Sequence, residues 1–334
     1  MMMTRRGLLG ALAVLSGLGG AARAAAGAVT VSVVYDLGGK MDKSFNQSGF
    51  QGVLAARRRL GATVHEYEVG VPADRPEVLR RAAAASGDVI VIGASAREAV
   101  ADVAAAAQPG VRFTMIDAAI VAPNVASILF ADHQAAFLAG VLAGHASGTG
   151  VAGFIGGAPV PPVLRFLSGF RQGLAHARVG ARLVETMLAA DAGAGVWDDP
   201  FRALLAARRQ IDRGADVLFA VCGGSGVGVY QAAADARVLA VGVDSNQNHL
   251  FPGTMLTSAV KRVDKAVVHA VNAIGRGTWM PETRVLGLAE DAVGVAIDGH
   301  NGALVGDLLP VLEQTRRAII TGRIDIAAPL FPIR

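Results

Sequence analysis

The feature of this chain that most constrains its fold is an alternation of short apolar runs with longer, alanine-rich segments of helical periodicity. Each pair of runs is separated by enough residues for a helix, and such strand–helix–strand units build parallel sheets covered by helices. Strands are expected at Val29–Asp36, Ala62–Val69, Val89–Gly93, Arg112–Asp117, Val151–Gly157, Ala181–Ala189, Val217–Cys222 and Val238–Asp244. The sequence therefore predicts an α/β fold with two doubly wound parallel sheets.

The order of these elements also predicts two lobes with a ligand cleft between them. A long helix over about Asp132–Ser147 connects the two series, and the C-terminal elements, including a strand around Arg284–Leu288, are interpreted as return crossings. We expect residues 28–131 plus about 257–282 in the first lobe, and 132–256 plus about 283–334 in the second.

The beginning of the chain has the pattern of an export signal. In residues 1–27, Arg5 and Arg6 precede an apolar stretch, and Ala22-Arg23-Ala24 offers a cleavage pattern. The twin arginines fit a twin-arginine signal and an ordinary secretory signal equally well. Cys222 is the only cysteine, so we expect no internal disulfide, no lipid anchor, and a monomer that diffuses freely in the periplasm.

Composition excludes several classes of function. Hydrophobic residues make up 52% of the chain and charged residues 17%, which is typical of sheets buried on both faces and not of a disordered protein. The net charge of +4 becomes +1 once the three arginines of the expected signal are removed. Binding to nucleic acid is therefore not expected.

Residues that end parallel strands are the first candidates for ligand contacts, because ligands bind at the carboxyl ends of such strands. These residues are carboxylates and glycines: Asp36, Gly93, Asp117, Gly157, Gly223, Gly224 and Asp244. This mixture favours a polar ligand that the backbone approaches closely.

The loop after the first strand predicts a helix start beside the cleft. Ser44 followed three residues later by Gln47 is a capping-box pattern. Capping alone needs Ser44 but not Asp42, so a ligand contact by Asp42 remains an open alternative.

A glycine-rich turn at Gly223–Gly228, with Asp244 twenty positions after Gly224, resembles a dinucleotide-binding fingerprint with imperfect spacing. What it supports is a ribose-like diol near Asp244. Lys261 ends an apolar run, and an unpaired lysine is costly to bury. We therefore expect Asp244 or a ligand diol as its partner.

No arrangement of a nucleophile with its base, no phosphate-binding loop and no metal-ligand spacing is recognisable. The chain is therefore expected not to be an enzyme and to use no cofactor or metal. Two alternatives remain: an exported oxidoreductase holding a nucleotide cofactor at Gly223–Gly228, and a sensor that presents its bound form to a membrane receptor.

Several motifs, taken in order, resemble the basic membrane protein family of ABC-transporter substrate-binding proteins, which includes purine nucleoside receptors. The similarity covers nearly all of the chain after the expected signal. The matching segments are Asp42–Gln47, Ala136–Gly140, Val151–Gly157, Gly169-Phe170, Gly223–Gly226, Gly242–Ser245 and Leu256–Arg262. The resemblance implies a type I periplasmic-binding-protein fold and delivery of a small molecule to a membrane ABC permease complex.

For a purine base, the resemblance implies a clamp of two aromatic rings at the lobe interface, Phe50 from the first lobe and Trp197 from the second. Asp42 would accept hydrogen bonds from the base. Phe45 and Phe50 share one helix and could instead both be core residues. Met41 stands where receptors of the family often carry a polar residue.

For a ribose, the resemblance implies that Asp117, Asp244 and Lys261 hold the sugar and that Gly223 lets the backbone approach. The turn Gly93–Arg97 departs from the family because it has no asparagine to match another base contact. Which purine is bound is left open.

Overall fold

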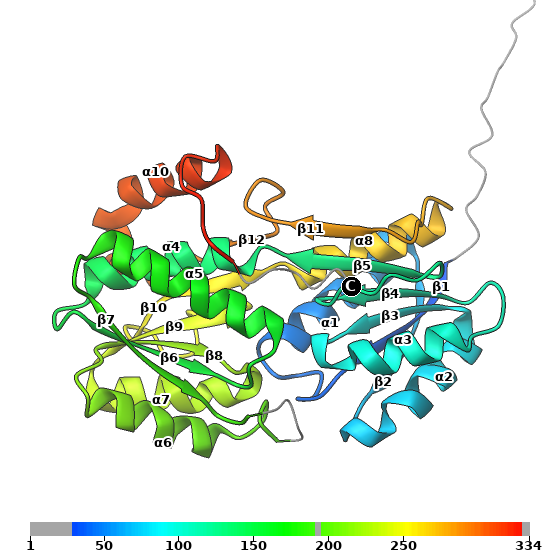
Figure 1. Ribbon diagram of the computed structural model, residues 1–334, viewed down its shortest axis with the longest axis horizontal. Helices are drawn as coiled ribbons and strands as arrows, with labels where there is room; N and C mark the ends of the chain where they lie inside the picture. Colours follow the sequence, from blue (N-terminus) through cyan, green and yellow to red (C-terminus); the bar gives the residue numbers. More distant parts are fainter. Residues whose placement is uncertain (1–28, 191–194, 329–334) are drawn as a thin grey trace, which may run out of the picture.

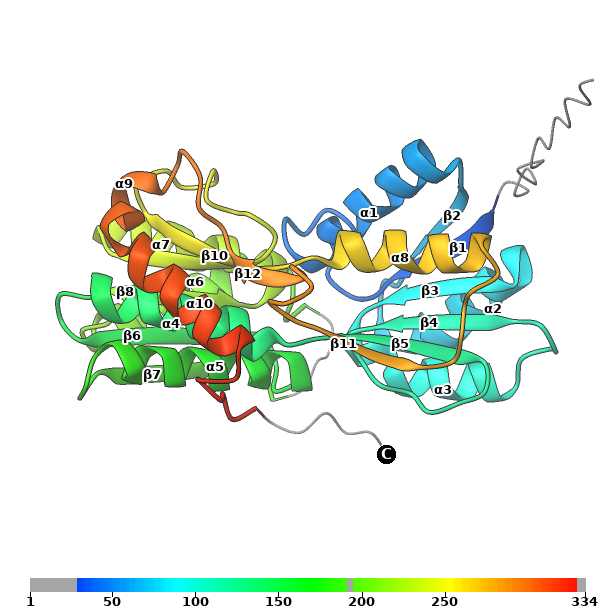
Figure 2. The ribbon, with the colours of Figure 1, turned by 90° about the horizontal axis from the view of Figure 1, so that it is seen from above.

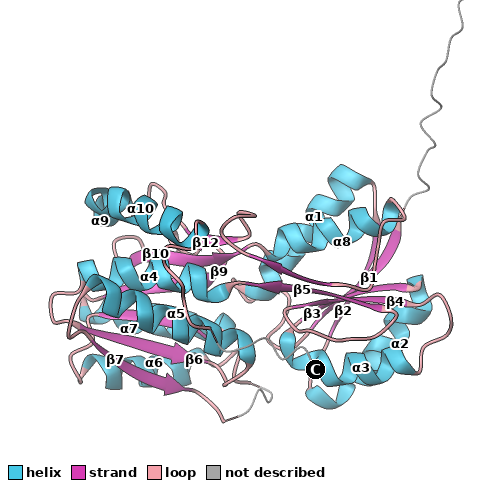
Figure 3. Ribbon diagram, turned by 45° about the horizontal axis from the view of Figure 1, so that its top comes forward, coloured by secondary structure: helices cyan, strands magenta, loops and turns pink. Residues whose placement is uncertain are grey.

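The computed structural model describes residues 29–190 and 195–328 of the 334-residue chain, so the expected export signal at 1–27 lies outside the described residues. These residues form two α/β lobes side by side, as predicted (Figure 1). Each lobe has a six-stranded, mostly parallel sheet with helices on both faces (Figure 3). Within the described ranges, no helix is long and apolar enough to cross a membrane.

The first sheet has the strand order β11-β5-β4-β3-β1-β2, and all of its strand pairs are parallel. The strands are β1 Thr30–Tyr35, β2 Thr63–Glu68, β3 Asp88–Ile92, β4 Arg112–Ile116, β5 Val125–Phe130 and β11 Thr283–Leu286. Its helices are α1 Phe45–Leu60, α2 Arg75–Ser86, α3 Arg97–Ala105 and α8 Val263–Gly275.

Alternating residues of β1 explain how this sheet acquires two helical layers. Val31 and Val33 belong to the core shared with α1 and α8, whereas Val34 belongs to the core beneath α2 and α3. Successive side chains of a strand point to opposite faces, so a continuously apolar strand needs cover on both sides. Figure 2 shows α1 and α8 together on one face.

The second sheet has the order β12-β10-β9-β8-β6-β7, with only β12 antiparallel to its neighbour. The strands are β6 Val151–Gly156, β7 Arg182–Met187, β8 Val217–Val221, β9 Leu239–Asp244, β10 Met255–Lys261 and β12 Val293–Val295. The helices are α4 Asp132–Ala146, α5 Pro161–Ala177, α6 Pro200–Ile211, α7 Gly226–Ala236, α9 Gly302–Val305 and α10 Leu309–Ile320. Short 3-10 turns lie at Pro72–Asp74, Ala94–Ala96, Gly223–Ser225 and Gly306–Leu308.

Helices α4 and α5 pack closely on one face of this sheet because glycines face the partner helix. A Cβ atom on Gly140 would collide with the backbone of Phe170, and one on Gly173 would collide with the backbone of Phe137. Helices α6 and α7 cover the other face, where Ala203 and Val229 share a core with Leu218 of β8.

The chain crosses between the lobes after β5, after β10 and after β11, and two of these crossings differ from the expected ones. The strand β10 extends the second sheet to Lys261, whereas 257–282 was expected in the first lobe. The strand β11 extends the first sheet, whereas residues from 283 were expected in the second. A strand belongs to the sheet whose neighbouring strands share backbone hydrogen bonds with it. A run of apolar residues predicts that a strand forms, but it does not show which strands will lie beside it.

Candidate functional site

A pocket of about 640 Å³, including its mouth, lies between the lobes at the carboxyl ends of the strands. The first lobe lines it with the ends of β1, β3 and β4 and the start of α1, and the second with the ends of β8, β9 and β10 and the start of α5. Six of the seven residues predicted from the sequence line it: Asp42, Asp117, Trp197, Gly223, Asp244 and Lys261.

The seventh residue, Phe50, does not line this pocket, and Phe45 does. Phe45 is the first residue of α1, whose N-terminus points at the pocket. Phe50 follows five residues later, about 140° around the helix axis and about 7.5 Å further along it. Its ring lies under the ammonium group of Lys40, 4.9 Å from the ring centroid. The first-lobe phenylalanine of α1 that lines the pocket is therefore Phe45, and not Phe50 as expected.

The N-terminus of α1 is capped by Asp42, and the prediction of a cap by Ser44 is wrong. The Asp42 Oδ1 atom accepts hydrogen bonds from the backbone N–H groups of Ser44 at 2.8 Å and Gln47 at 3.0 Å, and Oδ2 accepts one from Asn46 at 3.0 Å. Burial nevertheless raises the pKa of Asp42 to about 6, with these three hydrogen bonds opposing the shift. An electronegative side chain at a helix N-terminus satisfies otherwise unpaired donors.

Ser44 instead joins the two lobes. Its hydroxyl donates to Asp244 Oδ2 at 2.7 Å, and its carbonyl oxygen accepts a hydrogen bond from the hydroxyl of Ser245 at 2.8 Å. Next to it, Gln247 Nε2 donates to the carbonyl oxygen of Lys43 at 2.9 Å. The lobes therefore touch directly beside the pocket, in a closed arrangement.

Four buried charges form a cluster at the back of the pocket. Lys261 Nζ lies 2.7 Å from Asp117 Oδ2 and 2.9 Å from Asp132 Oδ1. The guanidinium of Arg165 lies 2.8 Å from Asp132 and 3.4 Å from Asp117. Lys261 is thus paired with the carboxylates of Asp117 and Asp132, and not with Asp244 as the sequence suggested.

Asp132 and Arg165 were not among the residues predicted from the sequence, because nothing local marks them as a pair. Asp132 begins α4, and Arg165 lies in the middle of α5 among apolar residues. A charge inside an apolar helical pattern is a signal, since an unpaired charge is costly to bury. Only the close packing of the two helices identifies the partner.

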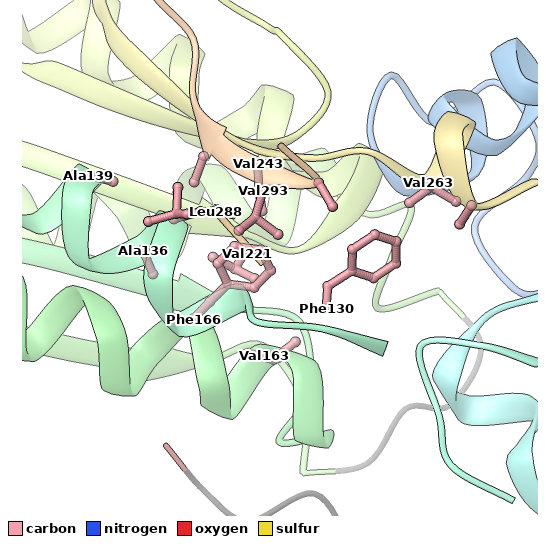
Figure 4. Packing of buried hydrophobic residues seen from close by; sticks show 14 of the residues in the cluster. Phe130, Ala136, Ala139, Val163, Phe166, Val221, Val243, Val263, Leu288 and Val293 are labelled. Atoms are coloured by element: carbon pink, nitrogen blue, oxygen red, sulfur yellow. The ribbon is translucent and has the colours of Figure 1, made fainter. Parts of the chain in front are cut away.

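Aromatic rings surround the ammonium group of this cluster. The ring centroids of Phe45, Phe130 and Phe166 lie 5.2 to 5.4 Å from Lys261 Nζ. Figure 4 shows Phe130, at the end of β5, and Phe166, on α5, in the apolar cluster where the lobes meet. The charges are therefore held in surroundings with few water molecules, where electrostatic interactions are strong.

Burial shifts the protonation of the carboxylates that face the pocket. It raises the pKa of Asp117 and of Asp244 to about 6, although the positive charge of Lys261 acts in the opposite direction on both. For Lys261, burial by itself lowers the pKa, but the neighbouring carboxylates outweigh it and the pKa is raised. Asp117 and Asp244 also have positive φ angles, 79° and 63°. Such backbone conformations are costly for residues other than glycine and are concentrated at functional sites.

The glycine-rich turn of the second lobe holds the loop that carries Trp197. The backbone N–H of Ser225 donates to the carbonyl oxygen of Trp197 at 3.2 Å, and the Ser225 hydroxyl donates to that of Val196 at 2.9 Å. Gly223 has a φ of 59° and lies against Trp197, where a Cβ would come 3.3 Å from its carbonyl oxygen. The spacing that suggested a dinucleotide site is therefore accounted for by the placement of Trp197.

The fold and this pocket define the class of two-lobed α/β binding proteins. The chain belongs to the Bmp family, described as ABC transporter substrate-binding protein PnrA-like, whose model matches residues 28–328. Members of this family are substrate-binding proteins and not enzymes; in ABC systems such proteins bind a small molecule and a permease complex.

Relatives agree with this assignment along most of the chain. A CD4+ T-cell-stimulating antigen of Listeria monocytogenes is 30% identical, and the alignment covers 91% of this chain and 88% of the antigen. The ABC transporter nucleoside-binding protein BmpA of Lactococcus lactis is 27% identical, with 88% of each chain covered. An uncharacterized lipoprotein of Pyrococcus horikoshii is 28% identical over 80% of this chain and 68% of its own.

Solved structures confirm the predicted two-lobed α/β fold. An ABC transporter solute-binding protein from Aeropyrum pernix superimposes with a TM-score of 0.81 at 25% identity, covering 90% of this chain and 94% of that one. A second solute-binding protein, from Conexibacter woesei, has a TM-score of 0.69 at 24% identity, covering 90% and 99%.

Proposed function

We propose that this protein is the periplasmic receptor of an ABC importer and that it binds a purine nucleoside or a related purine-like molecule in the pocket between its lobes. The observation that carries the proposal is that one cavity is lined both by buried charged groups and by aromatic rings from opposite lobes. The charged groups are Asp117, Asp244 and Lys261, and the rings are those of Phe45 and Trp197. The name of the Lactococcus lactis relative, a nucleoside-binding protein, supports this ligand class.

The charged groups of the pocket suit the hydroxyl groups of a ribose. A hydroxyl both donates and accepts, so a diol can donate to the carboxylates of Asp117 and Asp244 and accept from Lys261. An ammonium group has three N–H donors. Lys261 donates one to Asp117, and Asp132 lies 2.9 Å away as an ion-pair partner. We expect a remaining donor of Lys261 to bind a sugar oxygen.

The aromatic rings of the pocket suit a purine. Stacking of a base on an aromatic side chain contributes about 1–3 kcal/mol, and Phe45 and Trp197 reach the cavity from different lobes, so a stacked base would join them. Asp42 can also take part. Its carboxylate has about four acceptor positions, of which three backbone N–H groups use three, and the fourth can accept an N–H of the base.

Closure of the lobes connects this site to transport. Two hydrogen bonds between the lobes, from Ser44 to Asp244 and from Gln247 to the carbonyl oxygen of Lys43, form only when the lobes meet. A ligand that contacts both lobes favours the closed form by its difference in affinity for the two forms. The closed monomer is the form that the membrane permease complex would recognise, and no cofactor takes part.

Binding is tested with the protein purified after removal of residues 1–27. Mass spectrometry of the molecule released by denaturation identifies a co-purified ligand, and calorimetry then compares purine nucleosides, purine bases, pyrimidine nucleosides and ribose. We expect one molecule bound per chain, with a purine nucleoside the tightest and no turnover. The absence of heat with every purine nucleoside and base would refute the ligand class.

A further inference from the structure

The ends of β1 and β3 form a polar wall of the pocket that none of the roles above uses. Asp36 follows β1, Ser95 lies in the turn after β3, and both line the cavity. Arg75, at the start of α2, binds the Asp36 carboxylate with two N–H groups, Nε to Oδ1 at 2.7 Å and Nη2 to Oδ2 at 3.0 Å. Ser95 Oγ lies 2.5 Å from Asp36 Oδ2 and 3.3 Å from Arg75 Nη2.

This arrangement fixes the direction of the Ser95 hydrogen bonds. A carboxylate held by two guanidinium N–H groups is ionised and has no proton to give. The short bond to Asp36 therefore uses the hydroxyl proton of Ser95. Arg75 donates a hydrogen bond to one lone pair of the Ser95 oxygen. The second lone pair is left to accept a hydrogen bond from a ligand. Towards the pocket, Ser95 can only accept.

The other polar side chains near this wall have the same polarity. Asn46 Nδ2 is directed at the carbonyl oxygens of Asp36, Leu37 and Gly39, at 3.1 to 3.2 Å, which leaves its side-chain oxygen as the group for a ligand. Asp42 presents a carboxylate.

The wall follows the strands next to the one that carries Asp117. In the first sheet β3 lies between β4, which is followed by Asp117, and β1, which is followed by Asp36. Neighbouring strands are about 4.8 Å apart, so the turn that carries Ser95 is about one strand spacing from Asp117, and Asp36 is about two. If Asp117 holds the sugar of a nucleoside, its base is within reach of this wall.

We propose that Ser95, oriented by Asp36 and Arg75, is a specificity-determining residue that accepts a hydrogen bond from an exocyclic amino group of the ligand base. The pocket then selects amino-substituted purines over purines that lack this donor. This inference rests on the proposed function, and it adds the part of the ligand that the first lobe recognises.

Two matched pairs of nucleosides test it by calorimetry. Adenosine and purine riboside differ in the 6-amino group, and guanosine and inosine differ in the 2-amino group. In the wild-type protein, we expect the amino-bearing member of at least one pair to bind roughly tenfold more tightly, because its absence leaves a hydrogen-bonding oxygen without a partner. Ser95→Ala should reduce that ratio to within about threefold.

A matched control separates recognition from a general loss of structure. Ser86→Ala removes another partly buried serine hydroxyl of the first lobe, which bonds Ser32 and the carbonyl oxygen of Asp88 and does not line the pocket. This variant should keep the wild-type ratio. Asp36→Asn should lower the ratio. An amide nitrogen in place of Oδ2 would donate to the Ser95 oxygen, and the Ser95 hydroxyl could then donate its proton towards the ligand instead of only accepting.

The possible outcomes are distinct. If nucleosides bind but both pairs have equal affinities in the wild-type protein, the base is recognised by backbone groups and the inference is wrong. The same conclusion follows if Ser95→Ala keeps the full ratio. If no nucleoside binds at all, the proposed function has failed and not merely this part of it.

Discussion

Replacement of Lys261 by methionine tests whether the buried charge cluster holds the lobes together. Methionine keeps most of the length and apolar volume of the side chain and removes only the charge. The side chain of Lys261 is 2% exposed, and those of its partners Asp117 and Asp132 are 5% and 0% exposed. Removing one partner of a buried ion pair costs about 3–5 kcal/mol, and we expect Lys261→Met to lower the free energy of unfolding by this amount at pH 7.5.

The loss should depend on pH in a specified direction. Without Lys261, the carboxylates of Asp117 and Asp132 have only Arg165 to neutralise them, and protonation relieves their repulsion. The pKa of Asp117 is already raised to about 6 by burial in the wild-type protein, against the effect of Lys261, so removal of this lysine raises it further. At pH 5 the neutral acid needs no cation, and the difference between Lys261→Met and wild type should fall to less than half.

Urea unfolding followed by circular dichroism at pH 5 and pH 7.5 measures both effects. Lys265→Met is the matched control, because Lys265 is 40% exposed and pairs with Asp291 at the surface. Exposed pairs contribute about 0–1 kcal/mol, so this variant should remain close to wild type at both pH values. Equal stability of Lys261→Met and wild type at pH 7.5, or a loss that does not shrink at pH 5, would refute the reasoning.

Three further predictions concern the pocket. Ligand binding should change the tryptophan fluorescence of wild type and of Trp279→Phe equally, but should hardly change that of Trp197→Phe. The reason is that Trp197 lines the pocket, whereas Trp279 donates a hydrogen bond to Thr114 outside it. If the fluorescence change disappears in Trp279→Phe instead, the stacking wall is misassigned. Calorimetry of Asp244→Ala should show nucleoside affinity reduced by at least ~30-fold and free-base affinity reduced much less. The reason is that losing one partner of a buried polar network costs roughly 2–5 kcal/mol. Equal losses for both ligands would argue for a purely structural role of Asp244. Finally, the free energy of unfolding should fall as pH rises from about 4 to about 6, because Asp42 and the other two raised carboxyls hold protons in the folded state that they have lost in the unfolded state. Asp42→Asn should make this fall shallower in urea titrations, and an unchanged slope would contradict the raised pKa.

Much of the fold followed from local patterns. The strand-length runs and the helices between them appear in the structure near their predicted positions, because continuous apolar runs and 3.6-residue periodicity are properties of a few neighbouring residues. The short strands β5 and β12 were not anticipated, and the crossings near 257 and 283 were displaced. Strand pairing joins residues that are distant in the sequence, so sheet membership is not contained in a local pattern.

The site divides in the same way. The sequence by itself indicated that Asp117 and Asp244 each lie at the carboxyl end of a parallel strand, where ligands bind in such sheets. These two strands belong to different sheets, so only the arrangement of the lobes brings both residues to one pocket. Only the tertiary structure decided that Phe45 and not Phe50 lines the pocket, since the direction in which α1 points fixes which of its turns reaches the cleft.

Tertiary structure also decided the hydrogen-bond and charge partners. Ser44 was expected to cap its own helix, but it bonds Asp244 across the lobe boundary, which leaves the cap to Asp42. Arg165 and Lys261 are far apart in the chain and share the same carboxylates. The identity of a polar residue shows that it needs a partner when it is buried, but the packing of distant elements determines which partner lies within hydrogen-bond distance.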